Sequence, residues 1–114
     1  MDNRDVFLLE SIIDFCDRIN KSIIEHGGSF EVFEGDLDFQ DACNMRIIQI
    51  GENVSSLSDG FKLAHPEIPW KNIVGTRNIL VHDYGIMSNQ KVWNTLKNDI
   101  PNLRDFCAQQ IGKK

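Results

Sequence analysis

Apolar residues recur every three or four positions along the first part of this chain, between residues 4 and 26. The repeat runs through five large side chains and is widened by four more: Leu8, Ile12, Phe15, Ile19 and Ile23, with Leu9, Ile13, Cys16 and Ile24. This period is typical of an amphipathic helix that buries one face. Asp2 or Asn3 is predicted to cap its start, and Gly27-Gly28 to end it.

A second segment with the helical period covers residues 37–58, and Asp36 or Asp38 is its predicted cap. Its apolar face is predicted to consist of Ala42, Met45, Ile48, Val54 and Leu57, flanked by Ile47 and Ile50. Gly51 lies inside this helix, where glycine costs about 1 kcal/mol relative to alanine. A glycine at such a position allows close backbone packing, so we expect another helix to cross there.

Two more helices are predicted in the second half of the chain. Residues 70–84 form the third, which Pro69 opens and Gly85 ends. Residues 89–111 form the fourth, which Pro101 is expected to break or kink. The apolar faces of these two helices are predicted to be Trp70, Ile73, Val74, Leu80 and Val81, and Val92, Trp93, Leu96, Leu103, Phe106 and Ile111.

The remaining segments are predicted to be connectors. Residues 29–36 alternate apolar and polar side chains, but the chain offers no second strand to pair with them, so a loop that buries its Phe side chains is expected. Residues 61–69 contain Pro66 and Pro69, which exclude a continuous helix. Together, the predicted helices and connectors indicate an all-α, up-down bundle of four to five helices that forms a single domain over residues 1–114.

Composition limits the class of protein. Apolar residues make up 41% of the 114 residues, enough for one compact core. No apolar run is long enough to span a membrane, and the first residues lack the order of a signal peptide, which predicts a cytoplasmic protein. The net charge of −5 argues against broad, non-specific affinity for nucleic acid, but it is compatible with a local basic site or a basic partner.

Neither a cofactor nor a metal is predicted. Cys16, Cys43 and Cys107 are odd in number, far apart and embedded in apolar-periodic sequence. Without any Cys-x-x-Cys spacing they indicate neither a zinc site nor a disulfide framework. Buried free thiols are the expected outcome.

Reactive side chains gather in residues 77–84, which read Arg-Asn-Ile-Leu-Val-His-Asp-Tyr. The apolar triplet Ile79-Leu80-Val81 is predicted to pin this stretch to the core. His82 can act as a general base or acid, and Arg77 can stabilise charge that develops on phosphate oxygens. Together they suit metal-free attack on a phosphodiester, which in RNA would use the neighbouring 2′-hydroxyl.

A straight helix over residues 70–84 does not place the two groups on one face. At about 100° per residue, Arg77 and His82 lie about 140° apart around the axis, whereas Arg77 and Tyr84 lie within about 20°. Either the last turn unwinds before Gly85, or a second copy of the chain supplies the missing partner. The geometry therefore suggests a composite site.

A purely structural interpretation of these residues stays open. A histidine near a helix C-terminus is favoured by the helix dipole without any function. Tyr84 would cover the core with its hydroxyl outside, and Arg77 would pair with Glu52 across a helix interface. Substituting Arg77 or His82 would then change stability and no activity.

Three motifs occur in an order that resembles a known family. These are Ile50-Gly51-Glu52, then Pro66-x-x-Pro69-Trp70, then Arg77-x4-His82-x-Tyr84. The last matches the R-x4-H-x-Y motif of HEPN-domain proteins in their HepT-like toxin form. The family's chains are of about this size, so the resemblance covers nearly the whole sequence.

The resemblance implies a specific activity. HepT-like proteins form symmetric homodimers with two R-x4-H motifs in an interface cleft, and they act as metal-independent endoribonuclease toxins. Their antitoxin is a minimal nucleotidyltransferase that adds AMP to the motif tyrosine. On this chain Arg77 and His82 would be catalytic, Tyr84 would be the AMP acceptor, and Asn78 and Glu52 would support the site.

A binding module is the alternative function. In that case the chain would be a non-catalytic HEPN subunit that partners a nucleotidyltransferase. Intact Arg77 and His82 favour the ribonuclease, whereas a dimer that binds the transferase and cuts no RNA would favour the module.

Overall fold

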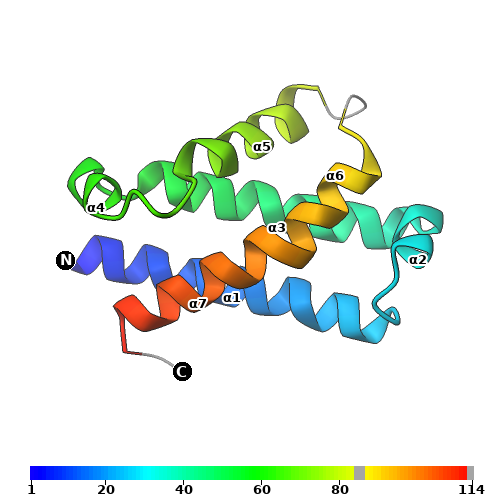
Figure 1. Ribbon diagram of the computed structural model, residues 1–114, viewed down its shortest axis with the longest axis horizontal. Coiled ribbons are helices and arrows are strands. Elements are labelled where there is room, and N and C mark those ends of the chain that lie inside the picture. The colour runs from blue at the N-terminus through cyan, green and yellow to red at the C-terminus, as the bar shows by residue number, and fades with distance from the viewer. Residues whose placement is uncertain (84–86, 113–114) are drawn as a thin grey trace.

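The chain is described by a computed structural model that covers residues 1–83 and 87–112. Every regular element in these two ranges is helical (Figure 1). The elements are α1 (Asn3–Glu25), α2 (Phe30–Gly35), α3 (Leu37–Ser56), α4 (Asp59–Ala64), α5 (Trp70–His82), α6 (Asn89–Asn94), the π-helix η1 (Thr95–Asp99) and α7 (Ile100–Gln110). The predicted all-α class is confirmed, and none of these helices is both long and apolar enough to cross a membrane.

The long helices run up and down along an elongated body of 42 × 30 × 20 Å (Figure 1). Helix α3 lies between α1 and α5 and packs against both. Helices α6, η1 and α7 follow one another without a break and return across the bundle to pack on α1. This arrangement covers α3 from two sides and leaves α5 at one edge of the molecule.

The predicted caps of the first two helices and the predicted stop of the first are confirmed, whereas the second helix ends at Ser56, two residues before its predicted end. Asp2 caps α1 by accepting a hydrogen bond from the Asp5 backbone N–H at 2.7 Å, and Asp36 caps α3 by accepting one from Phe39 at 3.0 Å. Gly27 and Gly28 end the first helical segment with φ of 89° and 71°, in the left-handed region that glycine tolerates.

The buried face of α1 is largely as predicted, but that of α3 is rotated. The buried apolar side chains of α3 are Phe39, Cys43, Ile47, Ile50 and Val54. The predicted Met45 is 56% exposed, and Ala42 and Ile48 are only partly buried, although Ile48 still packs against the core. The cause is that Gln40 and Asn44 occupy buried positions of the stripe, and Gln40 donates hydrogen bonds to the Phe33 and Glu34 carbonyls. Ile24, predicted to be buried, is exposed.

Residues 30–35 form the short helix α2 and not the predicted loop. The Ser29 hydroxyl accepts a hydrogen bond from the Val32 backbone N–H at 3.2 Å and so starts the helix. The helical turn brings Phe30 and Phe33 onto one face. Phe33 is fully buried, with its ring 5.3 Å from that of Trp93.

A second unpredicted helix, α4, interrupts the connector that follows α3. Helix α3 ends at Ser56 and the chain restarts as a helix at Asp59, capped by the Ser58 hydroxyl. The cap is itself held by α1, because the Ser58 backbone N–H and hydroxyl donate to the two carboxylate oxygens of Asp5 at 2.9 and 2.7 Å. Asp5 is only 2% exposed. This pair joins the N-terminal helix to the turn that leads toward α5.

Replacing Asp5 with alanine is expected to lower the free energy of unfolding by about 2 kcal/mol at pH 7, because two hydrogen bonds to a buried charge are lost. Burial raises the pKa of Asp5, but the hydrogen bonds from Ser58 and the positive charge of the N-terminus and Arg4 outweigh it, so the net pKa lies below the ordinary value of 3.8. The unfolded chain therefore binds the proton more readily, and this stabilisation is present above pH 3.8 and lost below it.

Urea unfolding at a series of pH values measures the effect of Asp5→Ala. The difference between wild type and variant is expected to shrink as the pH falls below 3.8. Glu10→Ala, at an exposed position of the same helix, is the matched control and should stay within about 0.5 kcal/mol of wild type. A constant difference across the pH series would show that the Asp5 charge is not what stabilises the turn.

Pro101 does not break the last helix. The preceding five residues, Thr95–Asp99, adopt the wider π-helical turn, and the Ile100 backbone N–H donates to Thr95 five positions back. A proline removes one N–H and pushes against the carbonyl four positions before it. A wider turn immediately ahead of the ring relieves that conflict, so helical structure continues from Asn89 to Gln110.

Candidate functional site

Close packing of α5 on α3 fixes where the site begins. A Cβ atom built on Gly51 would lie 2.7 Å from the Arg77 Cγ, closer still to the Arg77 Cβ, and 3.6 Å from the Ile73 carbonyl oxygen. Only a residue without a side chain fits at this crossing. The prediction that another helix crosses at Gly51 is confirmed, and the crossing helix carries Arg77.

The Arg77 side chain is held in one orientation by two neighbours. Its Nε donates to the Glu52 Oε1 at 2.8 Å, its Nη2 donates to the same oxygen, and its Nη1 donates to the Asn78 Oδ1 at 2.7 Å. A guanidinium has five N–H donors, so two of them have no acceptor among the described residues. The Arg77 side chain is 24% exposed. Arg77 is therefore an oriented cation with two N–H groups that can donate to a ligand.

His82 is not brought to Arg77 within one chain. It is the last residue of α5, is exposed, and its side chain forms no hydrogen bond or ion pair with any other residue that the structure describes. The Asp83 backbone N–H closes the helix on the Ile79 carbonyl at 2.8 Å. Because α5 stays helical from Arg77 through His82, unwinding of the last turn does not join the two side chains, and that alternative is wrong.

The apolar triplet before His82 is only partly anchored. Leu80 is 2% exposed, but Ile79 and Val81 are 38% and 42% exposed, so the prediction that all three enter the core was wrong. Three consecutive residues span about 200° of a helix, and a helix at the edge of a bundle has a core on one side only. The end of α5 therefore shows two apolar side chains beside an exposed imidazole. Tyr84, the predicted modification site, lies outside the described residues.

A groove of about 590 Å³ adjoins this cluster. It lies over the first half of α5, between that helix, α4 and the end of α3, and Asn78 is one of its lining residues. The sequence did not reveal it, because its walls come from three elements whose packing was not predicted. Gly75, in the middle of α5, is the only signal in the sequence that could have pointed to it.

The three cysteines lie in the core and are free, as expected. Burial raises the pKa of the Cys43 thiol to about 11 and that of Cys107 to about 12, and it also raises the pKa of Cys16. A protonated thiol is neither a good nucleophile nor a metal ligand. Among the residues that the structure describes, no three His, Cys, Asp or Glu side chains are grouped so as to hold a metal ion.

Comparison with known proteins identifies the family of the chain. The family model described as Ribonuclease HepT-like matches residues 8–110. A protein of Caldanaerobacter subterraneus subsp. tengcongensis named "Putative RNase" is 34% identical over 106 residues, which cover 93% of each chain. A "Probable ribonuclease HepT" of Thermococcus cleftensis is 37% identical over 75 residues, 66% of this chain and 68% of that protein. No solved structure matches significantly. The chain belongs to the HepT-like ribonuclease family.

Proposed function

We propose that this chain is the toxin of a toxin–antitoxin pair and cuts RNA as a metal-independent endoribonuclease. The observation that supports this most is the Arg77 guanidinium, which Glu52 and Asn78 orient while two of its N–H donors have no acceptor among the described residues. A guanidinium so held can bind phosphate oxygens without reorganising, which is how an enzyme stabilises charge that develops in a transition state. Family membership makes RNA the substrate to test first.

The proposed reaction is an internal transesterification. The imidazole of His82 removes the proton of an RNA 2′-hydroxyl, and that oxygen attacks the adjacent phosphorus. Arg77 stabilises the negative charge on the phosphorane oxygens. The bond to the 5′-oxygen of the next nucleotide then breaks, and the protonated imidazole of the same His82 gives this oxygen its proton. The products are a 2′,3′-cyclic phosphate and a free 5′-hydroxyl.

The reaction needs two subunits. Arg77 and His82 point about 140° apart on a helix that stays intact between them. A symmetric dimer that places the ends of two α5 helices together would pair the Arg77 of one subunit with the His82 of the other. The exposed Ile79 and Val81 flank His82 and offer apolar surface for such a contact.

Control of the toxin is proposed to act on the same region. Tyr84 follows His82 by two residues, and AMP transfer to its hydroxyl by a minimal nucleotidyltransferase antitoxin would add a bulky anion beside the reacting groups. That charge would compete with RNA phosphate for Arg77. A non-catalytic subunit that only binds the transferase is the alternative, and it is favoured if Arg77 serves only to tie α5 to α3.

Expression of the chain alone in a bacterium tests the proposal. Growth arrest with cleavage of total RNA on a gel is expected, and both should disappear with His82→Ala and with Arg77→Ala. Intact mass must show that Tyr84 is unmodified, and both variants must stay folded. A folded, unmodified wild type that neither stops growth nor cuts RNA would leave the binding subunit as the better account.

A further inference from the structure

Two glycines lie inside the long helices, and only one is explained by packing. Gly51 of α3 makes room for Arg77. Gly75 of α5 has no atom within 4 Å of the place where a Cβ would lie, and its φ is not in the left-handed region. A glycine in mid-helix is less stable than alanine. Neither the backbone nor a neighbour among the described residues accounts for that loss at Gly75, whereas a group outside the chain that needs the space would account for it.

The space above Gly75 is the groove of about 590 Å³. Its apolar wall comes from Leu63, Trp70 and Val74, and Leu63 is 80% exposed. The volume lies within the range of about 300–1,000 Å³ in which small-molecule sites fall. Apolar and aromatic surface beside charged groups is how single-stranded nucleic acid bases are held.

The charge on the groove is opposite to that of most of the molecule. Residues 1–58 contain twelve acidic and four basic side chains, whereas residues 59–98 contain three acidic and five basic ones. Lys62 and Lys71 line the groove with one carboxylate, Asp59. The Lys62 ammonium donates to the Val54 carbonyl at 3.2 Å, which keeps its charge beside the groove.

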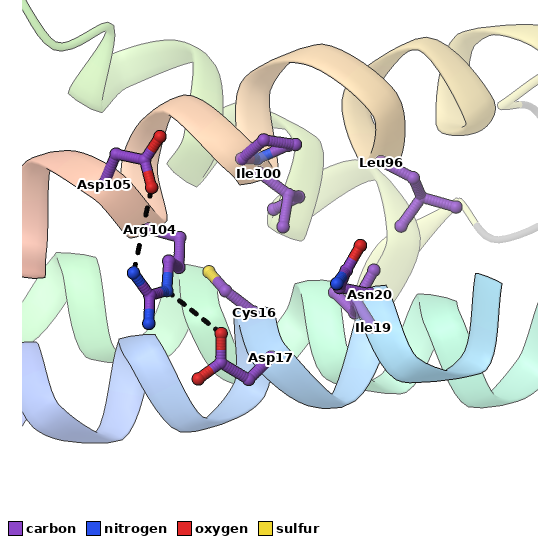
Figure 2. Close-up of a pocket in the computed structure, with 9 residues that line it drawn as sticks. Cys16, Asp17, Ile19, Asn20, Leu96, Ile100, Arg104 and Asp105 are labelled. Carbon is purple, nitrogen blue, oxygen red and sulfur yellow. Dashed lines mark hydrogen bonds and ion pairs between the residues drawn. The ribbon is translucent and has the colours of Figure 1, made fainter. Parts of the chain in front are cut away.

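A second cavity has the wrong charge for a phosphate. It has a volume of about 340 Å³ and lies between α1 and the η1–α7 segment (Figure 2). The guanidinium of Arg104 in its wall is paired with Asp17 at 3.0 Å and with Asp105 at 3.8 Å (Figure 2). Two carboxylates thus face one cation, so an anion is better accommodated over Gly75.

The groove also leads to the reacting groups. Lys71, Gly75, Asn78 and His82 follow one another at spacings of four, three and four, so they form one stripe along α5. Gly75 and His82 lie within about 20° around the axis and about 10 Å apart along it. Asn78 belongs to the groove and also accepts the hydrogen bond from Arg77.

We propose that this groove is the subsite for the nucleotide next to the cleaved bond of the RNA. The base lies on Leu63, Trp70 and Val74, above the open position at Gly75. The neighbouring phosphate faces Lys71 and Lys62, and the strand then follows the α5 stripe to His82. This inference rests on the proposed function, because it assigns the cleaved RNA as the occupant.

The test fills the groove without disturbing the fold. Gly75→Ala and Gly75→Leu are made in the His82→Ala background, and binding of a fluorescent single-stranded RNA is measured by anisotropy. Both substitutions should raise the melting temperature, because alanine and leucine favour a helix and the added Cβ meets nothing. Gly75→Ala should already bind RNA more weakly than its parent, because its methyl group takes part of the space that the base needs, and Gly75→Leu should bind at least tenfold more weakly, the loss expected when one base no longer stacks.

Salt dependence gives a second readout. Lys71→Gln should reduce the slope of log affinity against log salt by about 0.7, the loss of one phosphate contact on a single strand. Lys91→Gln, at an exposed lysine outside the groove, should leave the slope unchanged. Equal slopes for the two variants would overturn the assignment of Lys71.

These measurements test the subsite independently of whether the chain is a ribonuclease. RNA binding by Gly75→Leu equal to that of the parent, or no binding by the parent, overturns the subsite even if the wild type cuts RNA. Weakened binding by Gly75→Leu supports the subsite even if the wild type cuts nothing. A second copy of the chain could occupy the groove in place of RNA, and light scattering tests this by measuring the oligomeric state. If Gly75→Leu loses RNA binding only together with dimerisation, the assignment of RNA to the groove is overturned.

Discussion

Replacing His82 with alanine is expected to lower the rate of RNA cleavage by about 100- to 10,000-fold, the range that a general acid or base contributes. Stability should not change, because the side chain is exposed and has no partner among the described residues. Arg77→Ala is expected to cost a similar factor through loss of charge stabilisation, and it also frees Glu52. The measurement is the initial cleavage rate of a labelled RNA, together with the melting temperature of each variant.

Another histidine of the same chain provides the matched control. The His26 ring stacks on Phe39 with a centroid distance of 4.1 Å, and its Nδ1 donates to the Ser22 carbonyl at 2.7 Å. His26→Ala should therefore lower the melting temperature and leave the cleavage rate of the folded protein unchanged. If His82→Ala behaved in the same way, with stability lost and cleavage kept, the purely structural interpretation of His82 would be correct.

Replacing Gly51 with leucine is expected to lower the free energy of unfolding by about 3 kcal/mol or more. Overpacking a well-filled interface costs about 1–3 kcal/mol, and the nearest atom in the way here is the Arg77 Cβ, which cannot move without α5. Gly51→Ala should already be destabilising, although alanine is the better helix former by about 1 kcal/mol. Both variants should also cut RNA poorly, because α5 can no longer hold Arg77 against Glu52. Urea unfolding and cleavage assays measure the two effects.

The matched control is the other mid-helix glycine. Gly75→Ala makes the same chemical change on the partner helix, where an added Cβ meets nothing, and should stabilise the protein. Opposite signs for the two alanine substitutions would show that the effect at Gly51 comes from the α3–α5 contact. If Gly51→Ala were neutral or stabilising, α5 would not be seated on α3 as described.

The positions of the long helices could be predicted because their local signals agree. Asp2 and Asp36 cap α1 and α3, and the apolar period of α1 is uninterrupted up to Gly27. The phase of α3 could not be predicted, because the buried Gln40 and Asn44 look like surface residues. Their burial depends on partners that exist only in the folded chain, such as the Phe33 carbonyl.

The two short helices had weaker signals. Ser29 and Ser58 are good capping residues, but each is followed by only six helical residues, too few to show a period. The link from Ser58 to Asp5 joins positions 53 residues apart. Such a contact follows from packing and leaves no local pattern in the sequence.

The candidate site was likewise predictable only in part, where its residues lie in a local motif. Arg77 and His82 could be predicted as candidates because both lie in one short motif, and Glu52 because it is a possible partner for Arg77 across a helix interface and belongs to the family resemblance. The structure adds that Arg77 is oriented by Glu52 and Asn78 while His82 points elsewhere. The groove over Gly75 needed three packed elements before it could be seen.

The most direct test of the account is the RNA-cleavage rate of a mixed dimer, made by co-expressing Arg77→Ala and His82→Ala chains with different tags and purifying on both. We predict that each variant alone is inactive and that the mixed dimer regains up to half of the wild-type rate, since one of its two composite sites then holds an intact Arg77 and an intact His82. A mixed dimer as inactive as its parents, beside an active wild type, would contradict the composite site. An unmodified wild type that cuts no RNA in the same assay would contradict the ribonuclease.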